Sequence, residues 1–188
     1  DVDGDGSIDC LYVSRSDNDL RTLRAVYDLA ASEKDRADSA EANAEKSETT
    51  GEALALELKK LTSNPDGLKV LDVDQDGLLD VLIFVSYEPP ILVRQVEKNK
   101  FEVVDSPKAQ NSLIKDASLR SISAANVDGK AGDELLVAQN NFARSLVFSE
   151  GKTWNVIDQY NAKSTDNQIL AVAAFDLDAG SPADRPSI

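Results

Sequence analysis

Two stretches of the sequence concentrate aspartate at alternate positions. Residues 1–9 read DVDGDGSID and residues 72–80 read DVDQDGLLD, so carboxylates stand at positions 1, 3, 5 and 9 of both, with glycine at position 6. Because the aspartates occupy alternate positions, several side-chain oxygens lie on one side of a tight loop, and glycine permits the sharp turn. Carboxylates this close repel one another, and Ca²⁺, which accepts about six to eight oxygen ligands, relieves that repulsion. The pattern favours Ca²⁺ over Mg²⁺, which needs a stricter octahedron; the alternative is a solvated Asp/Gly turn.

Two further stretches, 126–134 and 176–184, carry weaker copies of this pattern. Their oxygen-bearing residues at positions 1, 3 and 9 are Asn126, Asp128 and Glu134 in one copy, and Asp176, Asp178 and Asp184 in the other. Lys130 takes position 5 of the first, where its ammonium group could replace the metal by pairing with the carboxylates, so calcium and lysine stay alternatives there. Gly180 takes position 5 of the second, which predicts weaker binding.

The residues after position 9 separate these stretches from helical calcium loops. An EF-hand needs a bidentate Glu at loop position 12 and a helix after it, but Tyr12 and Ile83 hold that position. The following strings, CLYVS and VLIFVS, have the composition of strands. Cys10 is the single cysteine, which excludes internal disulfides and thiolate zinc clusters. A strand–loop–strand calcium site is the remaining interpretation.

The acidic stretches belong to a longer repeat, whose copies start at residues 1, 72, 126 and 176. Each full copy predicts four strands, one of them ahead of the acidic loop. The predicted strands are 68–71, 81–86, 91–96 and 100–105 in one copy and 120–125, 135–139, 144–149 and 153–158 in the next, with further strands at 9–14 and 169–175. Four strands in roughly 50 residues is typical of a propeller blade.

An acidic loop of the form D-x-D-x-D-G-x-x-D before a hydrophobic strand, repeated along the chain, resembles the FG-GAP/VCBS-type calcium repeats of β-propellers, which include the integrin α-subunit head. The resemblance covers residues 1–14 and 66–188 and is sharpest at 68–86. It implies a calcium ion held between the first two strands of a blade. The implied ligands are the side chains of Asp1, Asp3, Asp5 and Asp9 with the carbonyl of Ser7, and those of Asp72, Asp74, Asp76 and Asp80 with the carbonyl of Leu78.

The interval 17–62 interrupts the repeat and predicts a helical insertion. It is rich in Ala, Glu, Leu and Lys, and either Asp17 or Asp19 is placed to cap a helix. Apolar residues recur at helical spacing in two runs: Leu20, Leu23, Tyr27 and Ala30, then Leu54, Leu58 and Leu61. The insertion is either a solvated excursion or an element that docks onto the propeller or another subunit.

The predicted fold class is therefore mainly β: a partial β-propeller of about three four-stranded blades with a helical insertion. The expected parts are the start of a blade with a calcium loop at 1–16, the insertion at 17–62, a blade with a calcium loop at 63–112, a blade with a degenerate loop at 113–165, and the start of another blade at 166–188. Because such a piece leaves strand edges exposed, we expect the remaining blades to come from further chain or from a partner.

Charge and composition limit the function. The chain has 188 residues with 20 Lys+Arg against 34 Asp+Glu, a net charge of −14, which argues against a nucleic-acid partner. It has no histidine and no apolar stretch long enough to span a membrane. We expect a non-catalytic, extracellular or periplasmic scaffold for protein interaction or adhesion, with a protein or a glycan as partner. The alternatives are a propeller domain of a polysaccharide-active enzyme, lyase-like or carbohydrate-binding, and a structural subunit attached through its insertion.

Overall fold

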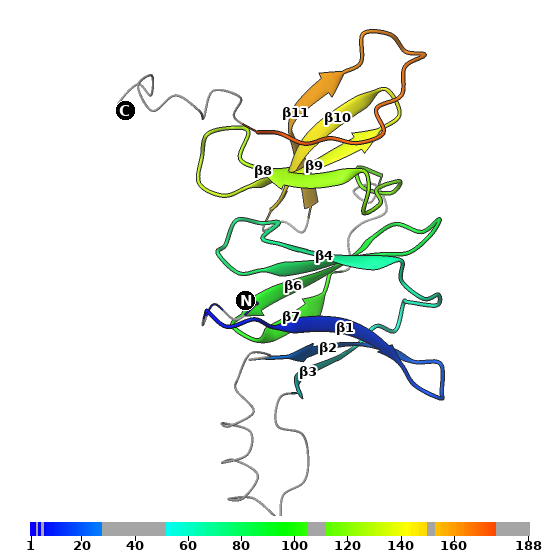
Figure 1. Ribbon diagram of the computed structural model, residues 1–188, viewed down its shortest axis with the longest axis vertical. Helices are drawn as coiled ribbons and strands as arrows, with labels where there is room; N and C mark the ends of the chain where they lie inside the picture. The colour runs from blue at the N-terminus through cyan, green and yellow to red at the C-terminus, as the bar shows by residue number, and fades with distance from the viewer. Residues whose placement is uncertain (3, 5, 28–51, 105–111, 150–152, 176–188) are drawn as a thin grey trace, which may run out of the picture. The chain divides into compact units, whose positions relative to one another are not determined.

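The computed structural model describes residues 1–2, 4, 6–27, 52–104, 112–149 and 153–175. These residues form eleven β-strands in three antiparallel sheets (Figure 1). The chain divides into two compact units, which are described separately. The first contains Asp1–Asp72 and Asp76–Asp105, and the second contains Val73–Gln75 and Ser106–Ile188.

The first sheet of the first unit has three strands in the order β1-β2-β3. They are β1 (Cys10–Arg15), β2 (Arg21–Val26) and β3 (Glu52–Glu57). A tight turn joins β1 to β2: the Ser16 amide donates to the Leu20 carbonyl at 2.9 Å, and Asp19 has a φ of 61°. Aspartate tolerates this left-handed conformation better than most residues. The string SDND at 16–19 therefore makes a hairpin turn.

The predicted helical insertion is wrong over the described part of 17–62. Residues 21–26 and 52–57 are strands, and the described residues contain no helix; the middle of the prediction, 28–51, lies outside the described residues. Leu23 and Ala25 are fully buried at the two-residue period of a strand. Pairing of β2 with both β1 and β3 supplies hydrogen bonds that the helical spacing of the leucines does not reveal.

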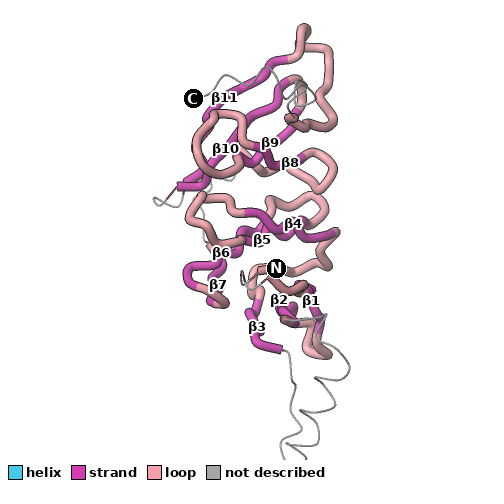
Figure 2. Tube along the Cα trace, turned by 60° about the vertical axis from the view of Figure 1, so that its left-hand side comes forward, coloured by secondary structure: helices cyan, strands magenta, loops and turns pink. Residues whose placement is uncertain are grey.

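The second sheet of the first unit is a four-stranded meander in the order β4-β5-β6-β7 (Figure 2). Its strands are β4 (Gly67–Leu71), β5 (Asp80–Phe84), β6 (Ile91–Glu97) and β7 (Lys100–Val103). All five residues of β5 are buried. One apolar core joins the two sheets of this unit, with buried members from both: Val2, Leu23, Ala25, Leu54, Leu58, Leu61, Val81, Ile83, Val85, Val93 and Phe101.

The second unit contains one four-stranded sheet in the order β11-β10-β9-β8. Its strands are β8 (Ile122–Ala125), β9 (Glu134–Gln139), β10 (Phe142–Ser149) and β11 (Thr153–Asn161). All six residues of β9 are buried. Phe148 and Trp154 pack edge to face with ring centroids 5.2 Å apart, and the Phe148 amide donates to the Val73 carbonyl at 2.8 Å. Residues 73–75 are therefore part of this unit, although the chain around them belongs to the first.

The strands predicted within the repeat are present, but the predicted fold class is wrong. All eight predicted strands of the two full copies coincide with β4–β11. The described residues, however, form three separate sheets, the first with three strands, and nothing establishes a propeller. The predicted strand 169–175 is also absent, and Leu170 and Phe175 are each 75% exposed. A strand requires a hydrogen-bonded partner, and an apolar run alone does not provide one.

Candidate metal site

The acidic loop of residues 72–79 connects β4 to β5 in the first four-stranded sheet. Leu71 and Asp80 are partners in the β4–β5 ladder, so the loop begins and ends at the same rung. Gln75 and Gly77 take left-handed conformations, with φ of 60° and 89°. The Asp72 carboxylate accepts hydrogen bonds from the amides of Asp76 (3.2 Å) and Gly77 (2.9 Å). These two hydrogen bonds fold the loop around the side chain of Asp72, which holds position 1 of the motif.

Three carboxylates of this loop converge. Asp72, Asp74 and Asp80 each present an oxygen, and the three oxygens lie within 4.8 Å of one another. Asp72 and Asp74 are half-buried, while Asp80 is fully buried. The Asp80 carboxylate accepts a hydrogen bond from the Gln95 amide on β6 at 2.9 Å. Because burial of a carboxylate is costly unless its charge is compensated, this cluster has the chemistry of a site for a hard cation such as Ca²⁺.

Asp76, which the sequence places among the same ligands, lies apart from the three-carboxylate cluster. Its carboxylate is 3.1 Å from the Arg94 guanidinium on β6 and also accepts from the Leu78 amide at 2.9 Å. The motif gives no indication that Arg94 is a partner of this loop. The β5–β6 ladder pairs Val81 with Val93, so the next rung places Arg94 beside the start of β5. The contact between Arg94 and Asp76 therefore depends on the strand register, which the sequence alone does not give.

The loop at residues 1–9 repeats part of this geometry. The Asp1 carboxylate accepts from the Gly6 amide at 3.1 Å, as Asp72 does from the equivalent glycine. The Asp9 carboxylate accepts from the Val2 amide at 2.5 Å, and the Asp9 side chain is 1% exposed. The predicted ligands Asp3 and Asp5 lie outside the described residues, and the role predicted for the Ser7 carbonyl stays a prediction.

The loop at residues 126–134 holds an internal cation. The Lys130 ammonium lies 2.7 Å from the Asp128 carboxylate. The side-chain hydrogen bond between them lowers the pKa of Asp128 and raises the pKa of Lys130. This is the pairing that the sequence offered as the alternative to a metal.

The backbone of this loop also departs from the other two. Position 4 is left-handed in all three loops, at Gly4, Gln75 and Gly129, but the second left-handed residue moves from position 6 to position 7, which is Gly132. The position-9 residue, Glu134, is 1% exposed and accepts from the Val127 amide at 2.7 Å. Asn126 accepts from the Gly129 amide at 2.8 Å. The position-1 and position-9 acceptors are therefore kept while the turn between them is altered.

Within the second unit, the Gln75 side chain connects residues 73–75 to the loop at residues 126–134. Its side-chain amide donates to the Glu134 carboxylate at 3.1 Å. A β-carbon added to Gly132 would lie 2.7 Å from Cγ of Gln75. The motif does not indicate this role of Gln75, because position 4 is not a ligand position in the pattern. The fourth predicted loop, with Asp176, Asp178 and Asp184, lies outside the described residues.

Comparisons of this chain with protein-family models, with curated proteins and with solved structures find no match. Across the part of the chain that the structure describes, no helix has the length and apolar character needed to cross a membrane.

Proposed function

We propose that the β4–β5 loop binds a calcium ion through the carboxylates of Asp72, Asp74 and Asp80. The observation that carries this proposal is the convergence of three carboxylate oxygens within 4.8 Å, one of them on a fully buried side chain. Asp76 becomes a fourth side-chain ligand when its carboxylate leaves the Arg94 guanidinium and binds the ion. The Leu78 carbonyl is the remaining ligand that the resemblance to FG-GAP/VCBS-type repeats implies.

The ion fixes the connection between three strands. The loop lies between β4 and β5, and Asp80 is hydrogen-bonded to the backbone of β6. Neutralising the carboxylates removes their mutual repulsion, so calcium binding adds its free energy to the stability of the fold. Extracellular calcium modules bind with dissociation constants of about 10⁻⁴–10⁻³ M, which suits an extracellular, cell-surface or periplasmic location.

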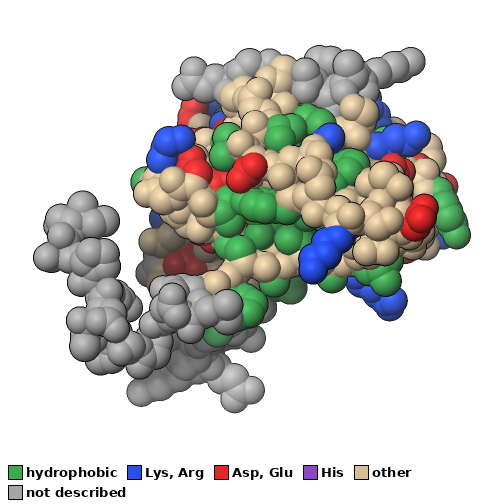
Figure 3. Space-filling model, turned by 90° about the horizontal axis from the view of Figure 1, so that it is seen from above, with side chains coloured by type: hydrophobic (Ala, Val, Ile, Leu, Met, Phe, Trp, Pro, Cys, Tyr) green, Lys and Arg blue, Asp and Glu red, His purple; other side chains and the backbone are tan. Residues whose placement is uncertain are grey.

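The function that follows is a non-catalytic, calcium-stabilised scaffold for protein interaction or adhesion. Strand β11 offers a surface for such a role, because Val156, Ile157 and Tyr160 on it are all more than 40% exposed. Hydrophobic side chains gather on the face seen in Figure 3. Exposed apolar groups of this kind, rimmed by polar ones, are typical of protein interaction sites.

Thermal unfolding with calcium and with excess chelator tests the proposal. Calcium should raise the Tm of the wild-type chain, and Asp74→Asn should remove most of that increase because it takes one charge from the cluster. Asp166→Asn is the matched control, since this exposed aspartate lies in the described segment after β11. A calcium-dependent increase that is equal in all three proteins, or absent from the wild type, would refute the site.

A further inference from the structure

A cavity of about 300 Å³ lies in the first unit, away from the acidic loops. One wall is the β1–β2 turn with the first residue of β2, residues 18–21. The other wall is the segment after β3, through Leu58, Lys59, Leu61 and Thr62. The Leu58 amide donates to the Arg21 carbonyl at 2.8 Å, so the two walls are held together beside the cavity.

Arg21 brings a buried positive charge to this cavity. The side chain is only 6% exposed. One terminal nitrogen donates to the Asp19 carbonyl (2.9 Å) and the Asp19 carboxylate (3.3 Å), and the other makes a long contact of 3.4 Å with the Asn64 side-chain oxygen. Its Nε–H has no acceptor among the described residues. A buried guanidinium with unused donors is costly unless an anion compensates it.

Asp19 balances only part of the positive charge of Arg21, because Arg15 binds the same carboxylate. Arg15 and Arg21 are opposite each other in the β1–β2 ladder, and Arg15 Nε lies 2.5 Å from the Asp19 carboxylate. Desolvation opposes ionisation of Asp19, but the hydrogen bonds and charges of the two arginines outweigh it and lower its pKa. Lys59 adds another cation to the cavity wall. Positive charge therefore exceeds negative charge here, in a chain whose net charge is −14.

We propose that this cavity binds an oxyanion, the carboxylate or phosphate group of a small molecule, between Arg21 and Lys59. Arginine's planar fork matches the two oxygens of either group, and lysine adds a point charge. Thr62 and Asn18 also line the cavity, and their side chains carry neutral hydrogen-bond donors. A cavity of this volume also holds part of the molecule that carries the oxyanion. The site is independent of the proposed calcium ion and does not involve its ligands.

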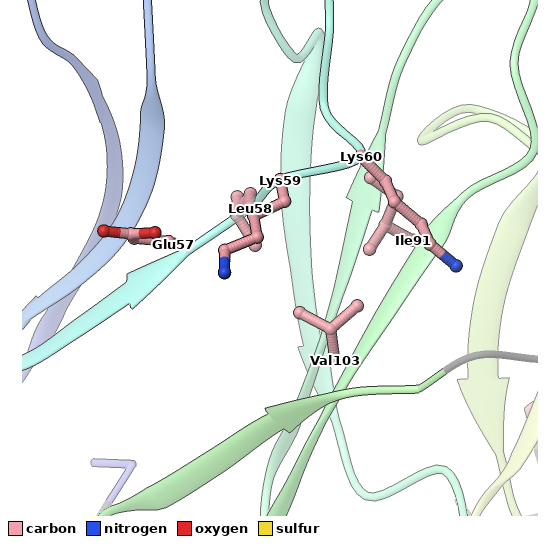
Figure 4. A pocket seen from close by; sticks show the side chains of 6 residues that line it. All are labelled: Glu57, Leu58, Lys59, Lys60, Ile91 and Val103. Carbon is pink, nitrogen blue, oxygen red and sulfur yellow. The ribbon is translucent and has the colours of Figure 1, made fainter.

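A neighbouring cavity of about 230 Å³ provides the contrast (Figure 4). It is lined by Leu58, Ile91 and Val103 as its apolar residues, and by Glu57, Lys59 and Lys60. Its wall contains a carboxylate and no buried cation, so it lacks the feature that defines an oxyanion site. Lys59 lines both cavities, whereas Lys60 lines only this one.

Nuclear magnetic resonance tests the proposal in calcium-containing buffer at constant ionic strength. The Arg21 Nε–H signal is followed while methyl phosphate is added in one arm and acetate in the other. We expect a saturable shift in at least one arm, and the tighter arm identifies the oxyanion. Lys59→Gln should weaken binding by about two- to five-fold, as expected for one exposed charge, while Lys60→Gln, one residue away, should leave it unchanged.

Two results would overturn the oxyanion site. The first is the absence of a saturable shift in both arms up to about 50 mM, where a site with a millimolar Kd is filled. The second is an equal weakening by Lys59→Gln and Lys60→Gln, which indicates unspecific attraction by surface charge. Arg21→Met removes the Nε–H reporter, so binding to that variant is followed through the backbone amide signals of residues 58–62, which should no longer shift on titration; if that variant does not fold, the two lysine variants decide the question alone.

Discussion

Replacement of Asp80 by asparagine should change stability in opposite directions with and without calcium. Asparagine has the same shape and keeps an oxygen that can accept the Gln95 amide, which now bonds to the Asp80 carboxylate at 2.9 Å. The substitution removes one negative charge from a cluster whose oxygens lie within 4.8 Å. Without calcium, the variant should therefore be the more stable protein; with calcium, it should lose most of the stabilisation that the ion gives the wild type.

The magnitude follows from Coulomb's law. Asp80 makes one such pair with Asp72 and another with Asp74, and at 4.8 Å, the upper limit of the oxygen separations, each pair of unit charges repels by about 3 kcal/mol at an effective dielectric constant of about 20. Loss of the charge on the hydrogen bond to Gln95 offsets about 1 kcal/mol, and solvent at the half-buried Asp72 and Asp74 screens most of the remaining repulsion. We expect Asp80→Asn to stabilise the calcium-free protein by about 1–2 kcal/mol.

Urea unfolding in chelator and in saturating calcium measures both effects. The midpoint of Asp80→Asn should lie above that of the wild type in chelator, and the order should reverse in calcium. A variant destabilised equally in both conditions would refute the reasoning, because it would show that Asp80 acts only as a hydrogen-bond acceptor.

Three further predictions concern the residues around these loops. Gly132→Ala should destabilise the fold by about 1–3 kcal/mol, because the left-handed backbone and the close approach of a side chain both oppose a β-carbon. Gly129→Ala, which has an equally left-handed backbone but open space, should cost only about 1 kcal/mol in the same urea assay; equal losses would contradict the packing argument. Arg94→Met should tighten calcium binding about two- to five-fold in calorimetry, since it releases Asp76; unchanged affinity would show that Asp76 is not a ligand. Lys130→Met should raise the pKa of the carboxyl that Lys130 pairs with, toward its ordinary value of 3.8, in a titration followed by NMR. Because that pKa is lowered in the folded chain, the stabilisation is present above pH 3.8 and is lost as the pH falls through the folded pKa; an unchanged titration would contradict the ion pair.

The strands of the repeat were predictable because several local signals agree there. In 81–86, an apolar run of strand length stands between an acidic loop and the turn before Pro89 and Pro90, and β5, at residues 80–84, overlaps it. The apolar residues around 21–26 fit two periods. Leu20 and Leu23 have the spacing of a helix, while Leu23 and Ala25 have the spacing of a strand. Short runs cannot decide between these periods; pairing with β1 and β3 decides, and it depends on residues distant in the sequence.

The convergence of three carboxylates could likewise be predicted in part from the sequence. The spacing along 72–80 places Asp72, Asp74 and Asp80 in one short loop, and closure of that loop at the Leu71–Asp80 rung brings their carboxylates together. The pairing of Asp76 with Arg94 depends on the register between β5 and β6, and the anchoring of Gln75 on Glu134 joins residues far apart in the chain. Such contacts arise from the folded sheets and have no signature in the motif.

A crystal structure of the chain grown with calcium tests the central claim most directly. We predict one ion in the β4–β5 loop, with oxygens of Asp72, Asp74 and Asp80 at about 2.3–2.6 Å from it, the distance typical of calcium. An ordered loop without an ion at saturating calcium, with Asp76 still bound to Arg94, would contradict it.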